Sequence, residues 1–557
     1  MRLSPLGDSA VVLASDDELD DALLARMRAL AEAITRHPPP GVIDVLAAFG
    51  SVAVYYDIAQ AGNYASLCAE LQKIAATLGK SRAATGESRR VEIPMCYGGE
   101  FGPDLDGVAA QAGVSAEEVI RLHSGADYRV HAIGFMPGFA YLGGLPKVLA
   151  TPRRGTPRAQ VAAGTLGIGG SQTGVYPLAT PGGWNLIGRT PLRLFDPAAR
   201  NPAMLHAGDH VKFRAVSMED FSRLTPGSTP EACTASRAPS ESSLQSMADA
   251  PTLTVVKAGM LTTVQDLGWR GHRAQGLPVS GAADSFALRL ANLLVGNPEN
   301  LAALECTLIG PHLHFSRDTL VALCGAQFGD WPHDQPVRVA AGTTLTFGAA
   351  RQGCRGYLAA AGGIDVPRIL GSRSTYLRAG FGGLEGRALR EGDTLRITAV
   401  ERRPAGRWHI DERIAPACTP SPTLRVIRGA QADEFSESLF SESYRVTPRS
   451  DRMGVRLAGP ALARRTAVDL LSVPALPGTV QVPPDGQPII LMADAQTIGG
   501  YPQIAHVISI DLLLVAQLRP GDSVCFREVT LGEAHECWMA RDRALATLRE
   551  GLAAKFT

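Results

Sequence analysis

Apolar residues recur at the helical period twice within the first 80 residues. Between residues 19 and 34 they fall three or four positions apart, and the polar segment 15–18 has the Ser-x-x-Glu pattern that caps a helix, which is predicted to run to about Arg36. A second amphipathic helix is predicted to end at Gly79. Short apolar runs predict strands at residues 10–13, 42–49 and 51–56. Residues 1–85 are therefore expected to form a small α/β sandwich, with two helices on a sheet.

The pattern changes after about residue 86. Glycine and proline are dense, apolar runs are short, and one helix is predicted between Ser115 and Gly125. Residues 86–222 are therefore expected to form a β-barrel or β-sandwich. Residues 223–250 are rich in Ser, Thr, Pro and Ala with few large apolar groups, and they predict a linker.

The second half of the chain is predicted to be mainly β as well. It divides into two β-rich units, residues 251–415 and 416–557. One helix is predicted at 284–295 with Asp284 as its N-cap, and another at 537–555.

Similar short motifs occur in the same order in both halves of the chain. Gln172-Thr173 precedes Tyr176-Pro177 in the first half, and Gln496-Thr497 precedes Tyr501-Pro502 in the second. A Gly-Thr pair stands upstream and a Gly-Asp turn downstream in the same order in both. This pattern predicts two related β-barrel units with paired sites. Chance similarity between turn motifs is the alternative.

Composition narrows the function classes. The 557 residues carry 54 Lys+Arg and 54 Asp+Glu, so no basic excess indicates a nucleic-acid binder. No apolar run is long enough to predict a membrane span, and the first residues lack the apolar core of a signal peptide. Nine cysteines without a Cys-x-x-Cys pair indicate reduced thiols, and twelve dispersed histidines predict no metal site. A cytoplasmic protein without a nucleic-acid or membrane partner is expected.

The densest candidate chemistry lies between residues 131 and 191. Its glycines would let backbone N–H groups approach a phosphate, at Gly167, Gly169, Gly170, Ser171 and Gly174. Substrate-binding roles are predicted for His131, Arg153, Arg158, Tyr176 and Arg189, with the arginines as partners for carboxylate or phosphate. The run lacks the lysine of a Walker A loop, so a standard P-loop is excluded. Turns, ion pairs and core packing are the structural alternatives for each residue.

Amide recognition and catalysis are predicted for residues of both halves. The Gln172 side chain has an acceptor and a donor in one plane, which complements an amide, lactam or urea group. The predicted catalytic residues are Gln172, Thr173, Asp284, Asp494 and Gln496. Arg378 and Tyr501 complete the predicted substrate-binding set.

These motifs resemble two known families. The segments 134–146, 167–177 and 181–191 resemble the allophanate hydrolase subunit 1 family, also called the B-type subunit of 5-oxoprolinase. The segments 259–296, 378–383, 451–454 and 483–502 resemble the subunit 2 family, the C-type subunit of 5-oxoprolinase. The resemblance implies a fusion of both subunits, with tandem cyclophilin-like β-barrels after a small α/β domain. Ala283 stands where the C-type family commonly has Met before Asp284, which would reshape a pocket there.

The resemblance also implies a function. It points to the fused B/C component of an ATP-dependent 5-oxoprolinase, which hydrolyses the 5-oxoproline lactam to L-glutamate with a separate A-type subunit. ATP, bound with Mg, would then be a co-substrate, and a homo-oligomer is possible. One alternative is the carboxyltransferase component of a biotin-dependent urea or amide carboxylase, with biotin carried by a partner. The other is a regulator that binds a histidine kinase.

Overall fold

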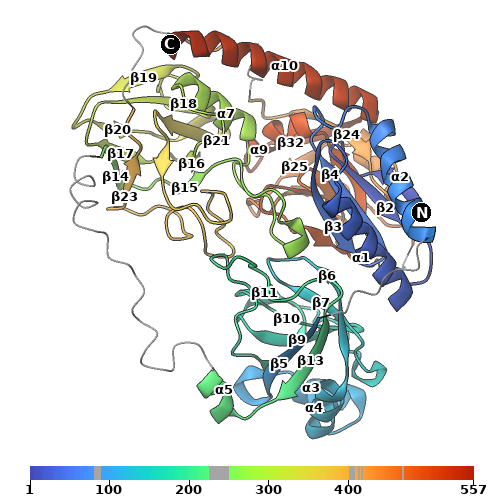
Figure 1. The fold of residues 1–557 in the computed structure, drawn as a ribbon. Coiled ribbons are helices and arrows are strands. Elements are labelled where there is room, and N and C mark those ends of the chain that lie inside the picture. Colours follow the sequence, from blue (N-terminus) through green and yellow to red (C-terminus); the bar gives the residue numbers. More distant parts are fainter. Residues whose placement is uncertain are drawn as a thin grey trace.

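A computed structural model gives the fold (Figure 1). It describes residues 1–80, 89–224, 250–400, 408–411, 414, 418–466 and 470–556, so nearly all of the predicted linker lies outside the described residues.

Four antiparallel strands in the order β1-β2-β4-β3 begin the chain, and two helices cover them. The helical stripe Leu23, Met27, Leu30 and Ile34 packs on this sheet, as its period predicts. Helix α1 starts later than predicted, because the Asp20 carboxylate, rather than Ser15, caps it by accepting from the Leu23 N–H. The bounds are β1 Arg2–Pro5, β2 Ala10–Ala14, α1 Asp21–Arg36, β3 Val42–Ala48, β4 Ser51–Tyr56 and α2 Tyr64–Lys80.

A closed barrel of seven strands follows, in the order β6-β13-β5-β12-β9-β10-β7, with β7 pairing back to β6. Its strands are β5 Arg90–Tyr97, β6 Tyr128–Ile133, β7 Ala140–Gly143, β9 Thr165–Gly169, β10 Gln172–Val175, β12 Asn185–Arg189 and β13 His210–Ala215. The short strands β8 Arg158–Val161 and β11 Thr180–Gly182 pair with each other. Three helices accompany the barrel within the described residues: α3 Leu105–Ala112, α4 Ala116–Gly125 and α5 Met218–Leu224. The sequence predicted only α4, because α3 is short and its N-cap residue makes no capping hydrogen bond.

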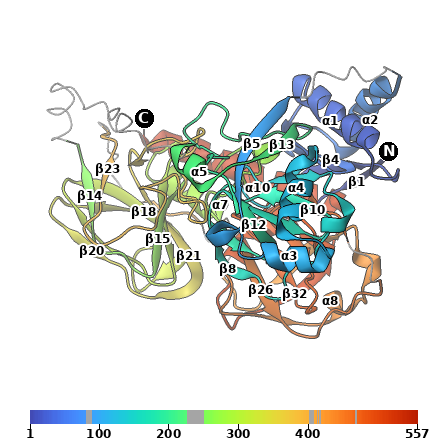
Figure 2. The same ribbon diagram turned by 90° about the horizontal axis from the view of Figure 1, so that it is seen from below.

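The second half begins with two five-stranded sheets, ordered β20-β17-β14-β23-β22 and β15-β16-β21-β18-β19. Their facing side chains form one core, and helix α7 packs on strands β18 and β21. Figure 2 shows this unit to one side of the barrels. The bounds are β14 Thr252–Lys257, β15 Leu261–Gln265, α7 Ser285–Leu294, β16 Ala303–Thr307, β17 His312–Phe315, β18 Thr319–Phe328, β19 Pro336–Val339, β20 Thr344–Thr346, β21 Ala350–Ala360, β22 Ile364–Asp365 and β23 Thr394–Ile397.

A second closed barrel has the order β24-β31-β28-β29-β26-β25-β32. Its strands are β24 Thr423–Arg428, β25 Tyr444–Val446, β26 Gly454–Ala458, β28 Thr479–Gln481, β29 Ile489–Leu491, β31 Gln503–Val507 and β32 Ser523–Glu528. The pair β27 Val473–Pro474 and β30 Ile498–Gly499 lies beside it, with the short helices α8 Ser438–Ser441 and α9 Leu512–Ala516.

The two barrels share one topology. Counted along the chain, each runs second, seventh, first, sixth, fourth, fifth, third, and in each the first and last strands are parallel. The prediction of two related barrels is thus confirmed. The repeated Gly-Thr and Gly-Asp motifs lie at the starts of equivalent strands in the two barrels. The repeated Gln-Thr motif lies at different positions in the two barrels: Gln172 begins the fifth strand of the first barrel, whereas Gln496 follows the fifth strand of the second. Gln496 is therefore not the structural counterpart of Gln172.

The halves meet through a shared core. Tyr55 and Trp184 of the first half belong to one apolar cluster with Leu476 and Ile498 of the second. The Tyr55 hydroxyl donates to the Ala475 carbonyl at 3.2 Å. At Gly134, the Ile498 side chain occupies the space where a Cβ would lie.

Replacing Gly134 by alanine is expected to lower the stability of the chain by about 1–3 kcal/mol, because the new methyl overpacks this junction. Its carbon would lie 2.1 Å from Ile498 Cγ1. The urea midpoint measures the loss, and Ile498→Ala in the same chain should recover part of it. Gly155→Ala is the matched control, since no heavy atom lies within 4 Å of its Cβ position. Equal midpoints for the Gly134 and Gly155 variants would contradict the expectation.

Helix α10, Leu531–Phe556, crosses from the N-terminal sheet to the two-sheet unit (Figure 1). Trp538 packs against the N-terminal core, and His535 Nε2 lies 2.8 Å from the Asp8 carbonyl. Leu552, near the other end of α10, packs in the apolar cluster that contains the buried side chains of α7. The helix begins before the predicted residue 537, because Thr530 and Glu533 form a capping box.

Candidate active site

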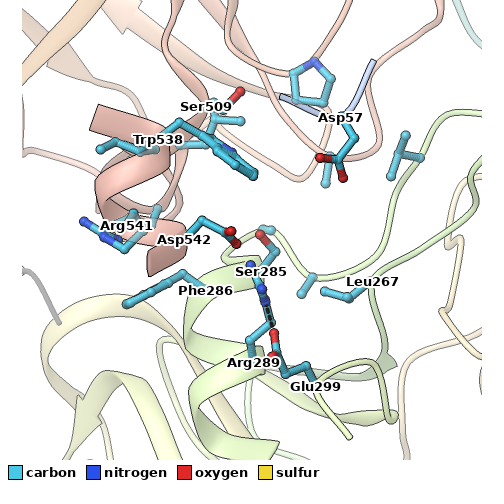
Figure 3. A pocket seen from close by; sticks show the side chains of 18 of the residues that line it. Asp57, Leu267, Ser285, Phe286, Arg289, Glu299, Ser509, Trp538, Arg541 and Asp542 are labelled. Carbon is cyan, nitrogen blue, oxygen red and sulfur yellow. Dashed lines mark hydrogen bonds and ion pairs between the residues drawn. The ribbon is translucent and has the colours of Figure 1, made fainter. Parts of the chain in front are cut away.

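A cavity of about 530 Å³ lies where four parts of the chain meet. Its lining includes Asp57 after β4, Ser285 and Arg289 of α7, Met492 and Ser509 of the second barrel, and Trp538 and Asp542 of α10. In Figure 3 the carboxylates of Asp57 and Asp542 point into the open space from opposite sides. Arg289 is paired with Glu299, and Arg541 stacks on Phe286. A space of this size suits a small ligand.

The loop between β15 and α7 supplies one wall of the cavity. The buried Asp266 carboxylate holds it by accepting from the Gly268 N–H at 2.8 Å and the Ser374 hydroxyl at 2.6 Å. Across the loop, the Trp269 N–H donates to the Val279 carbonyl. Gly268, at φ 78°, passes so close to Val279 that a Cβ would lie 2.1 Å from its oxygen. These bonds make the wall rigid.

A buried charge network lies under this wall. Arg452 donates from Nε and one terminal nitrogen to the Asp494 carboxylate, both at 2.9 Å, and from the other to Glu305 at 2.5 Å. All three side chains are buried. Burial alone would raise the pKa of Glu305, but the charges of Arg452 and Arg355 and the hydrogen bonds from Ala283 and Tyr357 together outweigh it and keep the pKa below its usual value. Glu305 is therefore held ionised.

Asp284 joins the same network. Its Oδ1 accepts from the Ala287 N–H and so caps α7 as predicted, while its Oδ2 accepts from Gln517 at 2.8 Å. Its own N–H donates to the Tyr357 hydroxyl, which donates to Glu305 at 2.7 Å. Burial raises the pKa of Asp284 to about 6. The structure thus brings together two predicted catalytic residues, Asp284 and Asp494.

The predicted phosphate loop is a β-hairpin. Three of its glycines lie within the β9–β10 ladder, Gly167, Gly169 and Gly174. A Cβ at Gly169 would lie 2.6 Å from the Trp184 indole nitrogen, so close packing accounts for this residue. Gly170, at φ 64°, and Ser171 form the tip. The hairpin leaves only this tip for a phosphate, and the exposed Arg153 follows two residues after Thr151, which pairs with Gly170.

The other predicted polar and aromatic residues of the first half lie inside or beside its barrel. Thr173 is fully buried, and its hydroxyl donates to the Gly167 carbonyl at 2.9 Å. Its neighbour on β10, Gln172, is partly exposed. His131 packs edge-on to Phe49, and Tyr176 packs in an aromatic cluster. None of these side chains lines the cavity.

The remaining predicted arginines make structural contacts. Arg158 pairs with Asp104 at 2.8 Å. Arg189 donates to the Ala163 carbonyl. Arg378 donates to the Thr180 hydroxyl at 2.9 Å, and it thereby ties the two halves together.

Gln496 and Tyr501 flank the junction of the barrels. Gln496 donates weakly to Gln481, at 3.4 Å, and Tyr501 is exposed. Neither lines the cavity.

Several residues of the cavity and network were absent from the predicted site. Ser280 lines the cavity at φ 51°, and its hydroxyl donates to Asp494 Oδ1 at 2.6 Å. Glu305, Arg452, Tyr357 and Gln517 complete the network. Glu305 is a charged residue inside the otherwise apolar strand β16, and Arg452 lies in the segment 451–454 that resembles the C-type family. Ala283, where the C-type family commonly has Met, lines the cavity.

Comparison with known proteins decides the family. Residues 275–528 match the carboxyltransferase domain, subdomain A and B, and residues 1–205 match the carboxyltransferase domain, subdomain C and D. The C subunit of 5-oxoprolinase from Escherichia coli is 42% identical over 292 residues, 51% of this chain and 93% of that protein. The B subunit of 5-oxoprolinase from Bacillus subtilis is 42% identical over 227 residues, 40% of this chain and 95% of that protein. The chain belongs to the family of the 5-oxoprolinase B and C subunits. It joins both in one polypeptide, as the motifs implied.

Relatives and solved structures extend this family assignment. The crystal structure of TTHA0988 has a TM-score of 0.79 at 35% identity, covering 93% of this chain and 99% of that one. Urea carboxylase of Kluyveromyces lactis gives 0.51 at 25% identity, covering 74% of this chain and 40% of that one. Urea amidolyase of Lachancea kluyveri is 34% identical over 53% of this chain, which spans only 18% of that protein. The family fold, mainly β with an α/β part, agrees with the sequence prediction.

Two further properties concern the described residues. No helix among them is long and apolar enough to cross a membrane. The same residues contain no group of three or more His, Cys, Asp or Glu side chains placed to hold a metal ion.

Proposed function

We propose that the protein is the fused B/C component of an ATP-dependent 5-oxoprolinase, which opens 5-oxoproline to L-glutamate together with a separate A-type subunit. The observation that carries the proposal is coverage: one chain matches over 90% of a B subunit and over 90% of a C subunit. The cavity supports it, because residues of both halves line one space.

The cavity offers a cation for the substrate carboxylate. Arg270 lines it, is exposed and has no ion-pair partner among the residues that the structure describes. Arg289 is neutralised by Glu299, so it is less suited to this role. We therefore assign carboxylate binding to Arg270.

We assign positioning roles behind the cavity wall to two buried carboxylates, Asp494 and Asp284, neither of which lines the cavity itself. Asp494 reaches the cavity through the Ser280 hydroxyl. Asp284 caps helix α7, which lines the cavity. The phosphates of ATP are assigned to the hairpin tip, Gly170 and Ser171, with Arg153.

A glutamate-release assay tests the function. The full chain, with the purified A-type protein, 5-oxoproline, ATP and Mg, should release L-glutamate and phosphate together. Either protein alone should release neither at a comparable rate. Failure of the complete mixture, with complex formation shown by gel filtration, would reject the proposal.

Arg270→Ala is expected to raise the KM for 5-oxoproline by about 10-fold or more, because a charge-assisted contact to the carboxylate is lost. The KM for ATP should not change. Arg121→Ala, an exposed arginine paired with Glu118 on α4, is the control and should leave both constants unchanged. An unaltered KM for 5-oxoproline in the Arg270 variant would remove this residue from the site.

The carboxyltransferase function is a second candidate. Both family matches are described as carboxyltransferase domains, and urea amidolyases are among the relatives. The ureido ring of biotin is also a planar N–C=O group, so the same cavity suits it. Biotin would be carried by a partner, and a streptavidin blot of co-purified proteins would detect that partner.

A further inference from the structure

Ser280 occupies an unusual position in the cavity wall. It is a non-glycine residue in the left-handed region, at φ 51°, within the rigid loop between β15 and α7. Its N–H donates to the Ala493 carbonyl at 3.0 Å, and Gly281, at φ 73°, follows it. Backbone strain of this kind persists where the surrounding structure imposes it, and it is common at ligand sites.

The hydroxyl proton of Ser280 has a fixed direction. Its oxygen lies 2.6 Å from Asp494 Oδ1, and Asp494 also receives two hydrogen bonds from Arg452. The Asp494 carboxylate accepts all three of these bonds, and the serine hydroxyl is the donor at Oδ1. Glu305 accepts from the other terminal nitrogen of Arg452 and does not compete for that proton.

A serine oxygen with a committed proton offers only lone pairs to a ligand. The wall around it is apolar and small: Val279, Ala282, Ala283, Met492 and Ala493. An acceptor in an apolar wall selects a neutral group that carries an N–H and rejects one that lacks it, because the buried acceptor would otherwise be left without a partner.

We infer that Ser280 binds the N–H of a cyclic amide and is the residue that selects substrates with an unsubstituted ring nitrogen. This inference rests on the proposed function and specifies which atom of the lactam the chain recognises. It implies that the ring nitrogen faces the β15–α7 loop, with Asp494 and Arg452 holding the serine in place rather than contacting the ligand.

Calorimetric titration of the full-length chain tests the inference with two probes, 5-oxoproline and N-methyl-5-oxoproline. The wild-type chain should bind the N-methyl compound about 100-fold more weakly. Ser280→Ala should weaken binding of 5-oxoproline and bring the two affinities within a few-fold of each other. Circular dichroism and a melting curve verify that the variant is folded.

Ser285 provides a matched control. It lines the same cavity, is exposed, and its hydroxyl has no hydrogen-bond partner among the described residues (Figure 3). Ser285→Ala should therefore keep the 100-fold discrimination of the wild type.

Three outcomes would overturn the inference: equal binding of both probes by the wild type, undiminished discrimination in Ser280→Ala, or no binding of either probe. The glutamate-release assay is read separately. Glutamate release with undiminished discrimination in Ser280→Ala rejects the role of Ser280 and keeps the proposed function. Discrimination that depends on Ser280 without glutamate release keeps the site and rejects that reaction.

Discussion

Replacing Arg452 by methionine is expected to lower the free energy of unfolding by about 3–5 kcal/mol, since it leaves two buried carboxylates without their counter-charge. Asp494 and Glu305 are 3% and 1% exposed, so water cannot replace the lost contacts. The urea midpoint of the purified chain, with the soluble fraction on expression, measures the loss.

The same experiment has an internal rescue. Neutralising the carboxylates with Asp494→Asn and Glu305→Gln in the Arg452→Met background should recover part of the lost stability, because the uncompensated charges are gone. Arg121→Met breaks an exposed ion pair on α4 and should leave the midpoint unchanged. An Arg452 variant as stable as this control would show that the network contributes little.

The stability of the chain is expected to fall as the pH rises from about 4 to about 6, through Asp284. Its pKa of about 6 in the folded chain exceeds the ordinary value of 3.8, so between these values the folded state retains a proton that the unfolded state has lost. The folded state is favoured below this window, and the advantage is lost by its upper end. The total effect is on the order of 3 kcal/mol.

Asp284→Asn isolates this effect, because asparagine does not ionise and its amide oxygen still accepts from the Ala287 N–H. Melting temperatures of both proteins are compared from pH 4 to pH 8. The difference, variant minus wild type, should grow up to about pH 6 and then stay constant. Asp8, whose pKa burial also raises, is present in both proteins and cancels. A difference that does not change with pH would contradict the assignment.

Local patterns predicted much of the fold. Helices α1 and α2 follow from apolar periodicity, α4 and α7 follow from their capping residues, and the β-barrels follow from short apolar runs between turns. The predicted start of a helix was wrong where two residues could each cap it, as Ser15 and Asp20 could for α1. It was also wrong where a capping box lies before the apolar positions, as at Thr530 for α10. Helix α3 was missed because two short turns carry too weak a period.

The candidate site was harder to predict, for a physical reason. Some of the motif residues in the first half are needed for close packing. Gly169 leaves space for the Trp184 side chain, and the Thr173 hydroxyl forms a hydrogen bond inside the barrel. The cavity depends on contacts between residues far apart in sequence, such as Arg452 with Glu305 and Ser280 with Asp494. No local sequence pattern predicts which buried charged residues will pair with each other. Asp284 was accessible to sequence reasoning because its capping role is local.

The position of helix α10 late in the chain has a consequence for folding during synthesis. The Tyr56 hydroxyl of the N-terminal sheet lies 3.2 Å from His535 Nε2, across a sequence separation of 479 residues. The N-terminal sheet therefore receives part of its cover from a helix that is synthesised 479 residues later, and that apolar surface stays exposed until α10 has been made. Nascent chains of this fusion should engage chaperones through the N-terminal sheet until α10 is made, and a chain stopped after β32 should be cleaved by proteases at that sheet more readily than at the second barrel.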